Sequence, residues 1–452
     1  MVRNPHISTD HSVDTRTVDS ILQSLISPKM SDEQKVLSVF HWIRRLLFHG
    51  DGPHDISFDF NKLFHSMGNG SCLRQTAPMA LLLDRLGFPS ESWVHDTHHM
   101  IQVRYEDAWH CLDPHMNFYV FNRANPRAIA GIDELRADPS LAFNAVAENR
   151  ACPGFLLCGD SPKWFTGDGE WIRDDGWPSI TLDEPFGRIT LRRGETYTRT
   201  WMPGEHYFHG TWKADEGPHH SCGPQDEKDT PNWPLYEPHP AHIRDYPSYK
   251  HWSTGSIVYA PNLASQHLLE DLSSATNVTT DASGSLVPAD PSKVAVVSVP
   301  VTCPYVVTDG SLRLDGALND LSVEIETDGN RYPLAVERYS ECVGADYVAP
   351  VNGCWNGHTV HIAFRGSLSP LELTTRFQIN AFSLPYLVPG PNTVQVSADH
   401  FDTPLNVAWT YAEGPDWSEQ DTASQTFDQS GSFTIDVAGA RHPRNISLTL
   451  SV

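Results

Sequence analysis

One stretch decides the expected fold, and over residues 68–114 it reads GNGSCLRQTAPMALLLDRLGFPSESWVHDTHHMIQVRYEDAWHCLDP. Apolar residues recur at helical spacing after Cys72 and stop at Gly87, which predicts a helix that ends on a glycine cap. Three strand-like runs follow, at 92–94, 100–105 and 109–112. Helices followed by short antiparallel strands predict an α+β arrangement for this part of the chain.

The segments around this stretch complete the expected organisation. Upstream, Ser31 and Gln34 form a capping-box pair ahead of apolar residues at helical spacing, so a helix is expected to begin there. Downstream, a helix is expected at 132–142, and the chain then turns to short strands separated by Gly, Pro, Asn and Asp. The strand spacing over 290–452 is typical of a β-sandwich.

These patterns divide the chain into three expected parts. The first is an α+β core with N-terminal helices at 1–185, and the second is a β-rich region with long aromatic and His-rich loops at 186–285. The third is a β-sandwich-like domain at 286–452. A Ser/Thr-rich stretch at 273–285 predicts a linker.

Three residues of the quoted stretch are suited to thiol chemistry. Cys72 follows two glycines and precedes the predicted helix, where backbone amides and the helix dipole favour a thiolate and can hold an oxyanion. His98 begins one predicted strand, and Asp113 lies on the next strand after a tight turn. Adjacent antiparallel strands can place an imidazole beside a carboxylate, which fixes its tautomer and stabilises its charged form. Nucleophile, base and orienting acid therefore appear in the order that thiol-based acyl transfer needs.

Each of these residues also has a structural interpretation. A cysteine before a helix is commonly a small buried apolar side chain, and Asp-Pro is an ordinary turn pair. His99 adjoins His98 and is an alternative base. Four residues near the triad are predicted to contribute to substrate binding: His99, Gln102, Trp109 and His115.

The chain resembles the transglutaminase-like superfamily in three motifs: GSC at 70–72, HHMIQV at 98–103 and WHCLDP at 109–114. The segment LLLDRLGFPSESWV at 81–94 is similar to the family's helix and following strand. The resemblance implies a papain-like cysteine-enzyme core followed by mostly-β domains. It also implies amidase, protease or transglutaminase-type chemistry through Cys72, His98 and Asp113, for which no cofactor and no metal is required.

Two departures from the family pattern lie beside the triad. Gln102 stands where relatives often carry Glu, and His115 follows Asp113-Pro114 where an acidic or small residue is more usual. Both changes leave the triad intact and imply a specialised pocket.

Residues 201–255 are crowded with aromatic and histidine side chains. A metal site would draw on His206, His209, His219, His220 and Cys222. Their spacing is neither that of a zinc finger nor HExxH, so no metal site is expected there. A substrate cleft is a second interpretation, with aromatic faces against sugar rings or peptide side chains. Its predicted substrate-binding residues are Arg244, Tyr246 and His251.

These loops keep a second class of function open. A polysaccharide lyase or glycosidase would use the aromatic and His-rich cleft, and the triad residues would then be structural or repurposed. A layer of rings packed between domains is the structural alternative for the same loops, and a binding protein without activity is the third functional hypothesis. The expected partner is accordingly a peptide, amide or polysaccharide substrate.

The composition excludes some partners and bears on location. The 452 residues include 32 basic and 56 acidic side chains, for a formal charge of −24, which disfavours binding to nucleic acid and anionic membranes. No apolar run reaches the roughly 18 residues of a membrane span. The N-terminal residues have no apolar stretch of a secretory signal, which predicts a cytoplasmic protein. A trimmed N-terminus would instead fit a secreted or periplasmic one.

Overall fold

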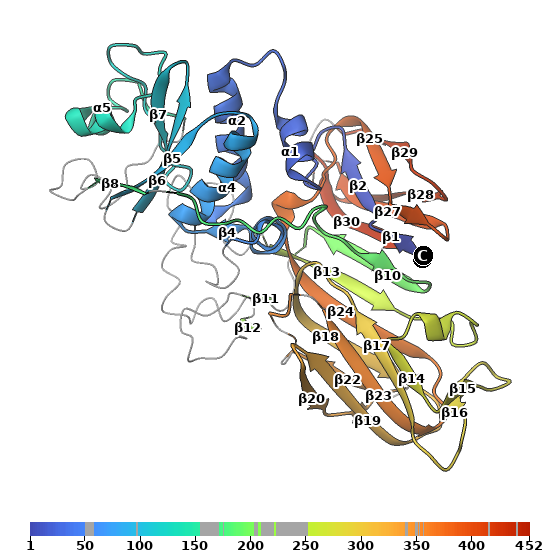
Figure 1. Ribbon diagram of the computed structural model, residues 1–452. Helices are drawn as coiled ribbons and strands as arrows, with labels where there is room; N and C mark the ends of the chain where they lie inside the picture. The colour runs from blue at the N-terminus through green and yellow to red at the C-terminus, as the bar shows by residue number, and fades with distance from the viewer. Residues whose placement is uncertain are drawn as a thin grey trace. The chain divides into compact units, whose positions relative to one another are not determined.

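The computed structural model describes residues 1–49, 58–95, 98–153, 171–174, 176–202, 207–208, 221–222, 252–339, 342–348, 351, 353–355, 357–414, 416–439 and 442–452. The described residues group into two compact units. One unit is rich in strands, and the other combines helices with a small sheet (Figure 1).

Strands dominate the chain, and this corrects the expected fold class. Strands account for 45% of the residues and helices for 17%, in several antiparallel sheets with few helices. The prediction of an α+β fold with a papain-like, transglutaminase-like core is therefore wrong, because no helical core of that kind is evident in the described residues. Helical periodicity near the N-terminus predicts local helices correctly, whereas fold class follows from the share and pairing of all elements in the chain.

The strand-rich unit contains Met1–Ser12 and the described residues of 185–222 and 252–452. Its largest sheet is antiparallel and runs, in spatial order, β21 (Glu337–Arg338), β22 (Val343–Tyr347), β18 (Val306–Leu314), β24 (Leu371–Asn380), β13 (Trp252–Tyr259), β10 (Glu195–Thr200), β30 (Arg444–Ser451), β27 (Leu405–Glu413) and β28 (Glu419–Phe427). A second antiparallel sheet runs β14 (Ser274–Thr276), β17 (Ala295–Val301), β23 (His358–Gly366), β19 (Leu318–Thr327) and β20 (Asn330–Leu334). Buried apolar side chains from both sheets belong to one core, which is compatible with the expected β-sandwich.

Smaller sheets complete this unit. The first two strands of the chain pair with segments almost 400 residues later: residues 2–3 pair with 400–401, and residues 6–9 pair with 394–397. These sheets are β26 (His400–Phe401), β1 (Val2–Arg3) and β9 (Thr190–Leu191), and β2 (His6–Thr9), β25 (Gly390–Ser397) and β29 (Gly431–Val437). Two-stranded pairs are formed by β11 (Tyr207–Phe208) with β12 (Ser221–Cys222) and by β15 (Val278–Thr280) with β16 (Leu286–Pro288). Since β14 and β15 lie within 273–285, the linker prediction for that stretch is wrong.

The second unit covers the described residues of 13–184. Its sheet is antiparallel, in the order β7 (Ala108–Leu112), β6 (His98–Tyr105), β5 (Ser90–His95) and β8 (Trp171–Asp174). A short parallel pair joins β3 (Phe48–His49) to β4 (Asn69–Gly70). The helices are α1 (Val18–Leu25), α2 (Asp32–Leu46), α3 (Phe60–Lys62), the π-helical turn η2 (Leu63–Met67), α4 (Cys72–Arg85), α5 (Ile132–Ala137) and α6 (Ser140–Phe143). Helix α4 packs against α2, β5 and β6.

The local signals of the sequence explain where these helices begin and end. Ser31 and Gln34 form the expected capping box at the start of α2. Helix α4 begins at Cys72 and contains Pro78, and Gly87 follows it with a φ of +84°, a left-handed conformation that favours glycine. Across the described chain, no helix combines the length and the apolar character needed to cross a bilayer.

Gly255 makes room for a stack of rings in the large sheet. It lies on β13, and a Cβ at this position would overlap the ring of Phe377. That ring is fully buried and stacks on Tyr305 at a centroid distance of 4.9 Å and on Tyr197 at 5.7 Å. The absence of a side chain at residue 255 is therefore a packing requirement of the core.

Replacing Gly255 should destabilise the strand-rich unit. Gly255→Ala is expected to lower the free energy of unfolding by about 1–3 kcal/mol, because the ring stack must shift to accept the methyl group. Chemical denaturation measures the change. The same substitution in a Phe377→Leu background should cost less, and an equal cost in both backgrounds would contradict the ring-clash explanation.

Candidate active site

The register of the small sheet brings the base and the carboxylate together. Ile101 on β6 pairs with Leu112 on β7, so the next residue along β7, Asp113, follows directly beside Met100. Side chains two residues apart on a strand share a face, which makes His98 a diagonal neighbour of Asp113. His99, one residue further along β6, points to the opposite face.

A buried hydrogen bond joins these two residues. His98 Nε2 lies 2.6 Å from Asp113 Oδ2, and the carboxylate is 1% exposed. The other carboxylate oxygen, Oδ1, accepts the backbone N–H of Met116 at 3.1 Å. Both oxygens are thus satisfied, as a buried charge requires. Because Nε2 is the ring nitrogen that contacts Asp113, Nδ1 is the nitrogen of His98 that can face another group.

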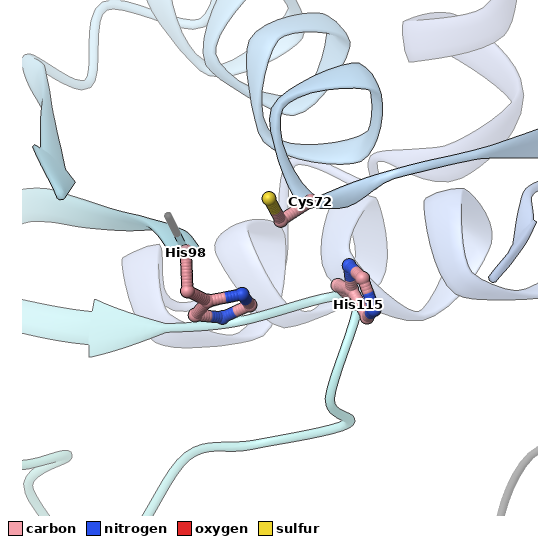
Figure 2. Close-up of side chains that lie close together, drawn as sticks. All are labelled: Cys72, His98 and His115. Atoms are coloured by element: carbon pink, nitrogen blue, oxygen red, sulfur yellow. The ribbon is translucent and has the colours of Figure 1, made fainter. Parts of the chain in front are cut away.

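Cys72 and His115 complete a cluster around His98. The Cys72 sulfur and one ring nitrogen from each histidine lie within 4.8 Å of one another. Figure 2 shows the three side chains converging, with Cys72 at the start of α4. The rings of His98 and His115 meet edge to face with centroids 5.4 Å apart. The structure therefore brings Cys72, His98 and Asp113 together and adds His115 from the turn after β7.

The surroundings of His98 favour its charged form. Burial alone would lower its pKa, but the charge and hydrogen bond of Asp113, with a further hydrogen bond and charge from Cys72, raise the pKa of His98 to about 10. The imidazole therefore carries a proton at neutral pH, between a carboxylate and a sulfur. An imidazolium in this position stabilises a thiolate.

Two other cysteines of this unit lie in surroundings that oppose ionisation. Burial raises the pKa of Cys111 well above its usual value, and the charge of Asp113 acts in the same direction. Burial raises the pKa of Cys152 to about 11. Both thiols are buried and remain protonated at neutral pH, so they serve as internal references for the reactivity of Cys72.

Arg44 is a neighbour of the site that the sequence interpretation missed. Its Nε donates a hydrogen bond to the backbone oxygen of Pro114 at 3.1 Å, in the turn between Asp113 and His115. Burial lowers the pKa of Arg44 to about 10, although the charge of nearby Asp113 opposes this shift. The sequence signal is limited to the position of Arg44 one helical turn after the buried Phe40 on α2, which places it near the buried face of the helix without identifying its partner.

The structure places three other predicted substrate-binding residues away from this hydrogen-bonded group. His99 Nδ1 lies 3.5 Å from the hydroxyl of Ser92, and burial lowers the pKa of His99. Gln102 is buried, and its Oε1 accepts the backbone N–H of Ile132 at 2.8 Å at the first residue of α5. Trp109 is half-buried on β7. Substrate binding by these residues stays a prediction.

The remaining predicted substrate-binding residues, Arg244, Tyr246 and His251, lie outside the described residues. The same holds for the histidines of the rejected metal site and for the side chain of Cys222. The structure therefore supplies no observation for the carbohydrate-active alternative that depends on these loops.

The charge state of His98 can be tested directly. Its ring should titrate near pH 10 rather than near the ordinary value of about 6.5. Asp113→Asn should lower this pKa strongly, and Cys72→Ala should lower it less, because Asp113 contributes more. NMR of histidine-labelled protein measures the titration. A wild-type His98 that titrates near its ordinary value would contradict the interpretation.

Gly70 is expected to be required for the placement of Cys72. A Cβ on Gly70 would lie 2.7 Å from Cβ of Arg74, which is fixed to the backbone of α4 and cannot swing away. Gly70→Ala should therefore displace the start of α4, cost about 1–3 kcal/mol of stability and slow the alkylation of Cys72. Gly176→Ala is the matched control, since among the described residues no atom beyond its chain neighbours lies within 4 Å of the added methyl group. Equal labelling of the two variants would count against this role.

Two comparisons with known proteins add no assignment to this site. Comparison of the chain with models of protein families found no match. Comparison with curated proteins found no similar sequence. The evidence for a function therefore lies in the geometry and chemistry of the chain's own residues.

Proposed function

We propose that the protein is a cysteine-dependent acyl-transfer enzyme in which Cys72 is the nucleophile, His98 the general base and acid, and Asp113 the residue that orients His98. The observation that carries the proposal is the position of His98. One ring nitrogen lies 2.6 Å from a buried carboxylate, and the other side of the ring faces the sulfur of Cys72. Nucleophile, base and orienting acid in hydrogen-bonded sequence are the requirement of covalent acyl transfer.

The first half-reaction forms an acyl-enzyme. His98 holds the proton of the Cys72 thiol, and the thiolate attacks the carbonyl carbon of an amide to form a C–S bond. The C–N bond then breaks, and His98 donates its proton to the leaving amine. Asp113 keeps the imidazolium oriented through Nε2 during both proton transfers.

The start of α4 supports this step. Cys72 is the first residue of α4, and the side chain of Ser71 forms no capping hydrogen bond to the first turn. Backbone N–H groups at a helix N-terminus are suited to binding the oxyanion of a tetrahedral intermediate. The Thr76 hydroxyl also donates a hydrogen bond to the backbone oxygen of Cys72 at 3.0 Å, which stabilises the first turn of α4.

The second half-reaction decides between hydrolysis and transfer. In hydrolysis, His98 takes a proton from water and the resulting hydroxide attacks the carbonyl carbon of the thioester. The C–S bond then breaks, the carboxylic acid leaves, and the Cys72 thiolate is restored beside the protonated His98. An amine in place of water would give a new amide. Hydrolysis is the reaction proposed here, because no feature of the described site selects an amine.

The proposal predicts a reactive thiol that depends on His98. Iodoacetamide should alkylate Cys72 at pH 7 about tenfold or more faster in the wild type than in His98→Ala, because the mutant lacks the imidazolium that stabilises the thiolate. Mass spectrometry of digested peptides measures the rate at each cysteine. Cys111 and Cys152 should remain unlabelled in the folded protein, and the partly exposed Cys342 provides a reference thiol outside the cluster.

Turnover provides the second test. Fluorogenic amides should be cleaved by the wild type, and a covalent adduct equal in mass to the acyl group should appear on Cys72 and disappear in Cys72→Ala. Slow labelling of Cys72 in both wild type and His98→Ala would overturn the mechanism. Cleavage that survives in folded Cys72→Ala would assign the activity to other residues.

A further inference from the structure

His115 is the part of the cluster that acyl transfer does not use. Its ring lies beside His98, and one of its nitrogens lies within 4.8 Å of both the His98 nitrogen and the Cys72 sulfur. All three side chains are more than nine-tenths buried, at 8% exposure for Cys72, 6% for His98 and 7% for His115. One sulfur and two imidazoles thus converge on one point inside the protein (Figure 2).

We propose that Cys72, His98 and His115 bind a Zn²⁺ ion, and that bound zinc withdraws Cys72 from acyl transfer. The metal site stands on the geometry of the three side chains alone. The inhibitory consequence rests on the proposed function.

The donor atoms match the preferences of zinc. Thiolate sulfur and imidazole nitrogen are its usual protein ligands, in tetrahedral geometry, with bonds of about 2.3 Å to sulfur and about 2.0–2.1 Å to nitrogen. Those bonds place neighbouring ligand atoms about 3.3–3.6 Å apart. The ligand atoms here lie within 4.8 Å of one another, so rotations of the side chains that close about 1 Å complete the site. Three protein ligands leave a fourth position for water.

Asp113 supplies the outer support that zinc-bound histidines usually have. A ligating imidazole commonly donates its other N–H to a carboxylate, which fixes the ring and makes the ligand nitrogen more basic. Asp113 holds Nε2 of His98 at 2.6 Å, so Nδ1 is the nitrogen that faces the metal position. The thiolate and this carboxylate together carry two negative charges, which balance the charge of Zn²⁺.

Zinc and substrate compete for the same atom. The lone pair of the Cys72 thiolate either attacks a carbonyl carbon or binds the metal. The Nδ1 lone pair of His98 likewise either accepts the thiol proton or binds the metal. Occupation by zinc is therefore incompatible with the first step of acyl transfer.

The test uses the purified full chain without a histidine tag. Because the chain carries 23 histidines, the readouts have to report on Cys72 specifically. Co²⁺ added to the metal-free protein should produce a sulfur-to-cobalt charge-transfer band and the visible bands of tetrahedral cobalt, and Zn²⁺ should abolish both. Zn²⁺ should also protect Cys72 from iodoacetamide, as measured by mass spectrometry.

Variants locate the ion. Cys72→Ser should lose the charge-transfer band. His115→Ala and the more conservative His115→Gln should weaken zinc protection of Cys72 by more than the 10–100-fold that a change in an outer-shell residue typically costs. His99→Ala is the matched control, because His99 lies on the opposite face of β6. The zinc affinity of this variant should equal that of the wild type. Thermal unfolding confirms that each variant is folded.

The results separate this proposal from the proposed function. Labelling of Cys72 without metal tests the thiol mechanism, whereas the cobalt band tests the metal site. A cobalt charge-transfer band together with slow labelling of Cys72 in the metal-free protein would support the metal site and refute the acyl-transfer mechanism. Fast labelling with no band and no zinc protection, or full zinc protection in both folded His115 variants, would overturn the metal site.

Discussion

The buried hydrogen bond between His98 and Asp113 is the interaction on which the site depends. A carboxylate that is 1% exposed is stable only if its charge is paired and its oxygens are bonded, and Asp113 meets both conditions through His98 and the Met116 amide. The same bond selects the orientation of the imidazole and directs Nδ1 away from the carboxylate. Whether that nitrogen holds a proton for Cys72 or a metal ion, its position follows from Asp113.

Local structure delivers each partner to this bond by a different route. The register of β6 and β7 brings His98 and Asp113 to neighbouring positions on one face of the sheet. Packing of α4 against β6 brings the first residue of α4, Cys72, to the same place. The turn after Asp113, held by Arg44 through the Pro114 carbonyl, adds His115. The proposed thiol chemistry and the proposed zinc site therefore use the same side chains, so the protein cannot bind zinc and carry out acyl transfer at the same moment.

The sequence predicted individual elements better than the class of the fold. The capping box at Ser31, the helix from Cys72 and the glycine after it depend on residues close together in the chain, and all three were identified. Fold class depends on pairings between distant residues, such as β1 with β26 and β2 with β25. Such pairings have no short-range signal, so the α+β class was wrong and the strands inside 273–285 were missed.

At the site, the sequence by itself predicted that Cys72, His98 and Asp113 act together, because residue type, element type and spacing agreed along a single stretch of the chain, and the structure brings the three side chains close to one another. It left His98 and His99 open as the base, and only the pairing of β6 with β7 placed His98, rather than its neighbour, beside the carboxylate. It also grouped Gln102 with the substrate-binding residues, whereas the tertiary structure buries that side chain under the first turn of α5. The convergence of His115 on the cluster and the approach of Arg44 from α2 were likewise decided by tertiary structure. The physical reason is that a side chain's partners depend on which segments pack together, and the periodicity of one segment carries no information about the segment that covers it.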